Sequence, residues 1–130
     1  MYTFWVPNFY IGENMSTAVL APTTITLTIP GGLSTSSIVT MAMPFAGVIS
    51  GAYVAVTTAP VGSALTADLK VGSDVAATFS IAAAGTSDEG TLTAANCDFA
   101  QGALVSLDVS AVGSSTAGSN MTVAFTVYEA

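Results

Sequence analysis

Alternation between apolar and polar residues is the feature of this sequence that most restricts its fold. From Leu65 to Val71 and again from Val75 to Ile81, every second residue is apolar and most residues between are polar. Because successive side chains of a β-strand point to opposite faces, a period of two predicts strands with one buried face. Gly72 and Ser73 separate the two segments, and a connection of this kind predicts a hairpin turn.

The same pattern recurs along the chain and predicts eight strands. They cover residues 24–29, 37–43, 48–56, 65–71, 75–81, 91–93, 103–109 and 121–128. No segment shows the apolar spacing of an amphipathic helix, and Gly, Thr, Val and Ser dominate throughout. Short strands separated by turn residues favour an all-β, two-sheet antiparallel β-sandwich, and eight of them favour a jelly-roll-like arrangement.

Composition predicts a folded chain without a membrane-spanning helix. Apolar residues make up 52% of the sequence and charged residues 7%, whereas disordered chains combine low hydrophobicity with high net charge. No charged residue occurs between Glu13 and Asp68, but prolines and glycines interrupt this stretch before about 20 consecutive apolar residues accumulate. Because the first residues lack the positive segment of a secretory signal, we expect synthesis and assembly in the cytoplasm of a cell.

The first 22 residues differ in kind from the rest. Five of the eleven aromatic residues stand among the first ten positions, namely Tyr2, Phe4, Trp5, Phe9 and Tyr10. We therefore expect an extended N-terminal arm, residues 1–22, followed by a β-sandwich domain, residues 23–130. The aromatic side chains of the arm either pack into their own core or bind a partner, since tryptophan and tyrosine supply much of the binding energy at interfaces. These five are the candidate partner-binding residues.

The sequence lacks the side chains that most enzyme mechanisms use. It contains no histidine, and its single basic residue is Lys70, so the commonest general base and the bidentate arginine clamp are both missing. The net charge of −7 opposes binding to nucleic acid and to anionic membranes. We expect a non-enzymatic protein with no catalytic, metal-binding or cofactor-binding residues and no cofactor.

The few charged residues have ordinary structural interpretations. Asp88 and Glu89 are adjacent and stand between glycines, which predicts a solvated turn; calcium binding there has little support because the Asp-x-Asp spacing is missing. Lys70 shares the polar face of its predicted strand with Asp68, which predicts a surface ion pair. Cys97 is the single cysteine, which excludes an intramolecular disulfide and predicts a small buried side chain.

Three stretches carry a resemblance to a known group of proteins. They are Pro44–Gly51, Thr58–Asp68, and Gly102–Val109 followed by Val112–Val123. Together they resemble a β-sandwich domain that recurs in virion proteins of tailed bacteriophages, including capsid decoration (cement) proteins, head fibres and tail tips, and the resemblance covers about residues 24–128. In this domain Phe45 would begin a buried strand, Pro60 and Gly62 would form a tight turn, and residues 113–120 would lead into the last strand.

The resemblance implies a structural virion protein. Because the domain occupies nearly all of a 130-residue chain, a decoration protein on the capsid surface is favoured over a receptor-binding tip carried on a long fibre. Such a protein would bind the major capsid protein, bridge neighbouring capsid subunits and form a homo-oligomer, with a trimer favoured.

Two alternatives stay open. A receptor- or carbohydrate-binding module of a phage fibre or tail tip would use exposed aromatic residues such as Trp5, Tyr53 and Tyr128. A hydrolase or isomerase would need an acid pair drawn from the aspartates at positions 68, 98 and 108, and ranks third.

Overall fold

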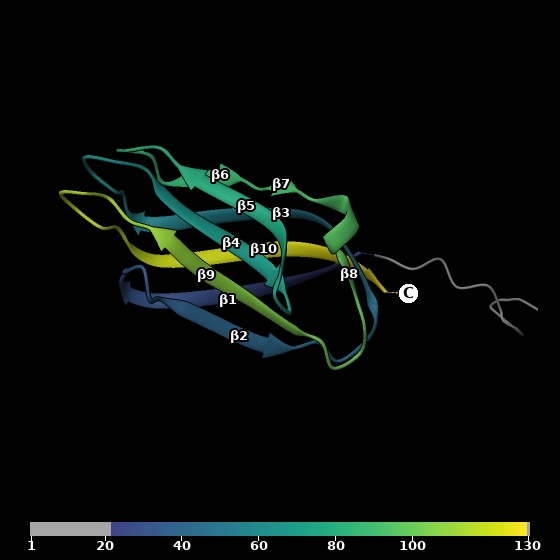
Figure 1. The fold of residues 1–130 in the computed structure, drawn as a ribbon. Helices are drawn as coiled ribbons and strands as arrows, with labels where there is room; N and C mark the ends of the chain where they lie inside the picture. Colours follow the sequence, from purple (N-terminus) through teal and green to yellow (C-terminus); the bar gives the residue numbers. More distant parts are fainter. Residues whose placement is uncertain (1–21, 130) are drawn as a thin grey trace, which may run out of the picture.

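The computed structural model describes residues 22–129, which form two antiparallel β-sheets packed face to face (Figure 1). The first sheet contains, in order, β1 (Thr23–Gly32), β10 (Ser119–Glu129), β3 (Gly47–Thr58) and β6 (Ser87–Glu89), and β8 (Asp98–Phe99) also pairs with β3. The second sheet contains, in order, β2 (Ile38–Ala42), β9 (Leu104–Ala111), β4 (Leu65–Val71), β5 (Asp74–Ile81) and β7 (Thr91–Leu92). A 3-10 helix, η1 (Ala94–Asn96), connects β7 to β8. The predicted all-β, two-sheet antiparallel sandwich is confirmed.

The strands pair as a series of nested partners. β1 pairs with β10, β2 with β9, β3 with β6 and β8, and β4 with β5, so that pairs formed at the ends of the chain enclose those formed in its middle. Successive pairs alternate between the two sheets. A long antiparallel ribbon rolled up in this way is a jelly roll. The predicted count of eight strands was too low because β6 and β8, of three and two residues, are too short to show alternation.

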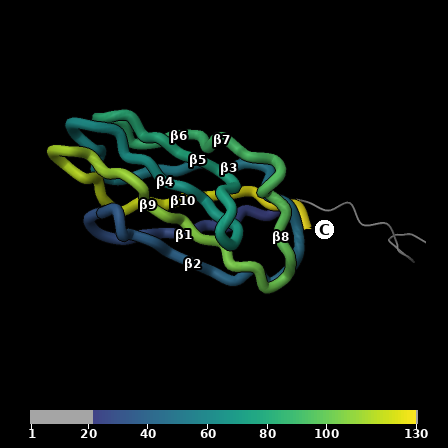
Figure 2. The backbone as a smooth tube through the Cα atoms, in the orientation of Figure 1, coloured from purple at the N-terminus to yellow at the C-terminus, as the bar shows by residue number. Residues whose placement is uncertain are grey.

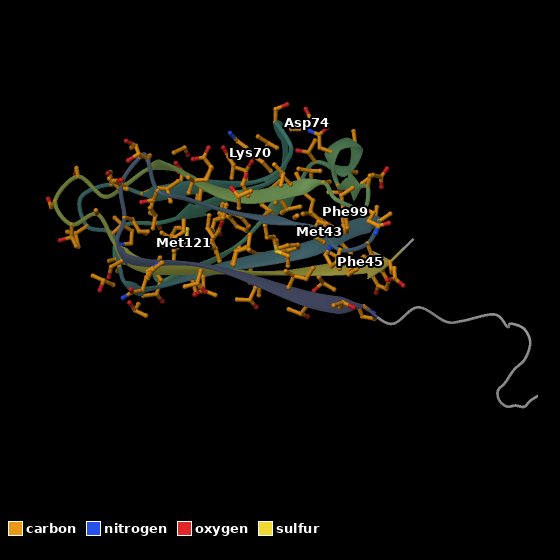
Figure 3. All side chains as sticks on the ribbon, turned by 90° about the horizontal axis from the view of Figure 1, so that it is seen from below. Met43, Phe45, Lys70, Asp74, Phe99 and Met121 are labelled. Carbon is orange, nitrogen blue, oxygen red and sulfur yellow. The ribbon has the colours of Figure 1, made fainter. Side chains whose placement is uncertain are left out.

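The apolar positions of the alternating segments form the core between the sheets. Phe79 on β5 and Phe125 on β10 are the largest fully buried side chains. Figure 3 shows Met43, Phe99 and Met121 between the two layers, and all three are buried. Full burial of one such side chain contributes roughly 1.5–3 kcal/mol to stability. Among residues 22–129 there is no helix long and apolar enough to cross a membrane.

Two local predictions were wrong. Asp88 and Glu89 do not lie in a turn but in β6, where they pair with Val54 and Tyr53 of β3. Phe45 precedes the strand instead of beginning it, because β3 starts at Gly47, and its ring is half-buried against that of Phe99 with 6.0 Å between centroids. The neighbouring residues favoured a turn at positions 88 and 89 and the start of a strand at Phe45. Pairing with segments distant in the sequence determines the structure at both places.

The predicted turn at residues 60–62 is held by a distant loop. The N–H of Val61 donates a hydrogen bond to the carbonyl of Thr116, 2.9 Å away, and the N–H of Ser115 donates one to the carbonyl of Val61. Gly62 has a φ of +93°, in the left-handed region that glycine adopts without strain. A Cβ at Gly113 would collide with the carbonyl of Thr116. The two loops therefore form one end of the sandwich together.

Candidate interaction surface

The candidate partner-binding residues of the arm lie outside the described part of the chain. This applies to Tyr2, Phe4, Trp5, Phe9 and Tyr10, and to Trp5 as a candidate for sugar binding. The role of the arm therefore stays a prediction. The surface of the sandwich itself offers the features described below.

Charged residues are distributed unevenly around the sandwich. Because no charge occurs between Glu13 and Asp68, β1, β2 and the segments that connect them to each other and to β3 carry none. β1 is the edge strand of the first sheet and β2 that of the second, and they lie side by side along one lateral side of the molecule (Figures 1 and 2). We call this lateral surface, residues 22–46, the charge-free side.

The opposite lateral side carries three acids on short strands. It is formed by β6, β7 and β8, residues 87–99, and contains Asp88, Glu89 and Asp98. A carboxylate oxygen of Asp88 accepts a hydrogen bond from the backbone N–H of Ser80, 2.8 Å away. Because Asp88 belongs to the first sheet and Ser80 to the second, this bond ties the two sheets together. We call this the acid-bearing side.

Apolar side chains are covered less completely on the charge-free side. Val39 and Met41 of β2 are packed against the core but only half-buried, as is Ile25 of β1. On β5, in contrast, Ile81 and Phe79 are fully buried. The core is therefore covered more completely at β5 than at β2, although Leu92 on the short edge strand β7 is half-buried too.

Two exposed aliphatic side chains lie on the outward face of the second sheet, at and next to the edge strand β2. Ile38 on β2 and Leu104 on β9 are each 56% exposed, and Leu104 is the cross-strand neighbour of Ala42. The acid next to them in the sheet is Asp108, opposite Ile38. Sequence reasoning missed this surface. Its signal is the long stretch without charge, which was used only in the argument about a membrane-spanning helix.

Threonine dominates the outward face of the first sheet. On β1 the threonines at positions 24, 26 and 28 are exposed, and Thr28 and Thr122 on β10 approach within 3.4 Å through their hydroxyl oxygens. Tyr53 on β3 is 59% exposed and Tyr128 on β10 is 42% exposed. Tyr128 pairs with Val48, five residues from Tyr53 along β3, which separates the two tyrosines by about 16 Å. A single sugar ring cannot contact both.

The outward face of the second sheet holds an ion pair different from the predicted one. The Nζ of Lys70 lies 3.1 Å from a carboxylate oxygen of Asp108 on the adjacent strand β9, with the two side chains 28% and 31% exposed. The predicted partner, Asp68, stands opposite Asp108 in register. Lys70 stands opposite Ser106, so Asp108 is its diagonal neighbour on β9, within reach of the long lysine side chain. Asp98, the third candidate acid, lies in the other sheet on β8, so the structure does not assemble the three.

Cys97 is buried, as predicted, and lies under the acid-bearing side. Its thiol is within hydrogen-bonding distance of the carbonyls of Thr93, at 3.3 Å, and Ala76, at 3.7 Å. Burial and, secondarily, the negative charge of Asp98 raise the pKa of this thiol above its ordinary value. Cys97 therefore stays protonated near neutral pH. In the described part of the chain we find no pocket and no group of three or more potential metal-ligating side chains.

Comparison with known proteins yields a structural likeness and no sequence match. No family model matches the chain, and no curated protein matches it. The fold is similar to that of a chain in the capsid asymmetric unit of cyanophage Pam1, with a TM-score of 0.52 and 15% sequence identity, and the likeness covers 96% of this chain and 100% of that one. At this identity the likeness concerns the fold: this chain has a jelly-roll sandwich of a type found in a phage capsid.

Proposed function

We propose that this protein is a non-enzymatic structural component of a tailed-phage virion, and specifically a decoration protein on the outside of the capsid. The observation that supports this most is the likeness of fold to a chain of the cyanophage Pam1 capsid asymmetric unit over nearly the whole length of both chains. The resemblance of three sequence stretches to phage virion sandwiches points the same way. In this role the protein binds the major capsid protein, bridges neighbouring capsid subunits and stabilises them against internal pressure.

The surface chemistry suits permanent contact with other proteins. Threonine, serine and alanine cover most of the outward strands, and the first sheet carries its acids only on β6, on β8 and at Glu129. Burying such a surface requires little desolvation of ions, which is the costly part of forming a charged interface. Sites repeated on a capsid lattice add avidity to contacts that are individually weak.

The aromatic arm, residues 1–22, is the proposed anchor to the capsid. A segment of 22 residues spans at most about 75 Å when extended, far enough to reach a neighbouring capsid subunit. Tyrosine and tryptophan contribute large contact areas at little entropic cost. The five aromatic residues of the arm are therefore the proposed partner-binding residues.

The test uses capsids that lack this protein, assembled from a phage genome in which its gene is deleted. Purified protein is added and the particles are imaged by electron microscopy, with thermal rupture of the particles measured in parallel. We expect density at repeated lattice positions and a higher rupture temperature. A variant with all five arm aromatics changed to serine should lose both effects. The matched control, Tyr53→Ser with Tyr128→Ser, changes aromatic residues of the sandwich and should keep both.

One outcome would favour the alternative of a receptor- or carbohydrate-binding module, for which the exposed Tyr53 and Tyr128 are the supporting observation. In that case the protein adds no density to capsids but binds host cells or a glycan array. This binding is then lost in the double tyrosine variant and kept in the arm variant. Such a result would contradict the decoration role.

A further inference from the structure

We infer that the charge-free side, residues 22–46, is the surface through which copies of this chain associate with one another. The inference deepens the homo-oligomer part of the proposed function by naming the surface and the partner, and it rests on that part alone. Three independent features of the sandwich carry it: its unpaired strand edges, its charge distribution and its incomplete core.

The strand edges on the charge-free side lack one of the usual protections, which is charge. Exposed edges pair readily with other chains, and proteins protect them with charged side chains, bulges, prolines or very short strands. Within residues 22–129, β1 and β2 each have one strand partner. β1 runs for ten residues, with Pro30 and a register shift only at its end, and neither strand carries a charge. The opposite edges consist of strands of two or three residues with Asp88, Glu89 and Asp98 beside them. Protection by charge is thus confined to the acid-bearing side.

The distribution of charge favours a second copy of the chain as the partner that binds the charge-free side. Each copy carries a net charge of −7, so two copies repel unless the contact keeps their acids apart by more than about 8 Å, the screening length at physiological salt. Contact through the acid-bearing sides would bring six carboxylates together. Contact through the charge-free sides places these groups on the far sides of both molecules.

The charged residue that pairs with β2 is neutralised within the same chain. Asp108 stands opposite Ile38 in the second sheet, and it is paired with Lys70, the single basic residue of the sequence, at 3.1 Å. Figure 3 shows Lys70 on the outside of the molecule. The only positive side chain therefore stands where it cancels the acid that a second copy would meet.

The incomplete core supplies the apolar area for the contact. Ile25, Val39 and Met41 pack against the core while remaining half-buried. Ile38 on β2 and Leu104 on the adjacent strand β9 are exposed on the outward face of the same sheet edge. A second copy covering this strip would bury these side chains, with a gain of about 25 cal/mol for each Å² removed from water. Three copies with their charge-free sides facing a common axis bury the strip in every subunit and leave the acids outside, which fits the favoured trimer.

The experiment measures the mass of the full-length protein in solution by light scattering and sedimentation equilibrium. For the wild type we expect three times the 12.9 kDa of one chain. The variant Ile38→Asp with Leu104→Asp should fall threefold in mass to the monomer. Both residues are exposed in the isolated sandwich, so each variant should stay folded, which circular dichroism verifies. The control is Val61→Asp, which adds one negative charge, half that of the double variant, at a 46% exposed apolar residue in the β3–β4 connection and should keep the wild-type mass.

Several outcomes would overturn the inference. These are a monomeric wild type, a double variant that keeps the wild-type mass, or a Val61→Asp variant that dissociates to the same extent. A dimer that the double variant dissociates would support the surface and contradict the trimer. Failure of the wild type to bind capsids, with its mass unchanged at three chains, would contradict decoration while supporting self-association. The two proposals are therefore tested separately.

Discussion

The two lateral sides of the sandwich solve the problem of exposed strand edges in opposite ways. On the acid-bearing side the edges are short, carry Asp88, Glu89 and Asp98, and are tied across the sheets by the bond from Ser80 to Asp88. On the charge-free side β1 and β2 are uncharged and the core is partly open. The difference agrees with the use proposed for each side: the side proposed to stay free is charged, and the side proposed for contact is not.

This comparison predicts that the loss of an apolar side chain has different consequences on the two sides. Phe79→Ala removes a fully buried ring next to the acid-bearing side and should lower the free energy of unfolding by about 3–5 kcal/mol. Met41→Ala removes a half-buried side chain on the charge-free side and should cost about 1–2 kcal/mol in the monomer. Urea denaturation at several protein concentrations measures both.

Concentration dependence separates the two variants. The cost of Phe79→Ala should be the same at all protein concentrations, because the ring contacts only its own chain. The cost of Met41→Ala should grow with protein concentration. Association stabilises the folded wild type more as the concentration rises, and a variant that associates more weakly gains less from it. A concentration-independent cost for Met41→Ala would show that the opening of the core is not covered by another copy.

Two glycines test how tightly each side is packed. A Cβ at Gly90, between β6 and β7, would lie 2.6 Å from the ring of Phe79, so Gly90→Ala should destabilise by roughly 1–3 kcal/mol through overpacking. A Cβ at Gly32, in β1, meets no atom within 4 Å, and this glycine does not adopt a positive φ. Gly32→Ala should therefore be neutral or stabilise by up to about 1 kcal/mol. Thermal unfolding of the two variants checks the contrast, and equal effects would contradict it.

The sequence predicted the layers of the fold better than its edges. Strands such as Leu65–Val71 and Asp74–Ile81 alternate over many residues with one face buried, so their existence and their inward residues follow from the period alone. β6 and β8 have no period to detect, and they form because segments of β3 distant in sequence pair with them. The close approach of Gly90 to Phe79 likewise arises from contact between elements.

The candidate site was predicted only in part. Exposure of Tyr53 and Tyr128 follows from their places in alternating strands, and both are exposed. The partner of Lys70 was wrongly predicted because strand register, which sets Asp108 beside it, is not encoded in the spacing within one strand. The charge-free side is visible in the sequence as a stretch without charge. Only the strand order shows that this stretch forms the two adjacent edge strands β1 and β2.

Alkaline pH should weaken the acid-bearing side first. The pKa of Cys97 is raised in the folded protein by burial and by Asp98, so the folded state holds a proton that the unfolded state releases. Between the two pKa values the unfolded state binds fewer protons, and the free energy of unfolding therefore falls as pH rises above the ordinary pKa of the thiol, about 9, through the raised value. The contribution is fully present below that range.

The measurement compares wild type with Cys97→Ala by urea denaturation between about pH 7 and pH 10, a range set by the thiol pKa. Other groups titrate in both proteins, so the difference between the two curves isolates the thiol. Wild type should lose stability more steeply, by at most about 1.4 kcal/mol per pH unit. Parallel curves would mean that the thiol ionises as easily in the folded protein as in the unfolded chain.

The smallest expected effect concerns the ion pair next to the charge-free side. Because Lys70 and Asp108 are both about one-third exposed, Lys70→Met should change the free energy of unfolding of the monomer by only about 0–1 kcal/mol. It nevertheless leaves Asp108 unpaired opposite Ile38, so each copy presents an uncompensated carboxylate where copies meet. Self-association should weaken, and added salt should partly restore it by screening the repulsion. Lys70→Arg keeps the charge and should associate like wild type. If Lys70→Met associated as strongly as Lys70→Arg at low salt, Asp108 would lie outside the contact, and the interface would have to be confined to β1 and the outward face of the first sheet.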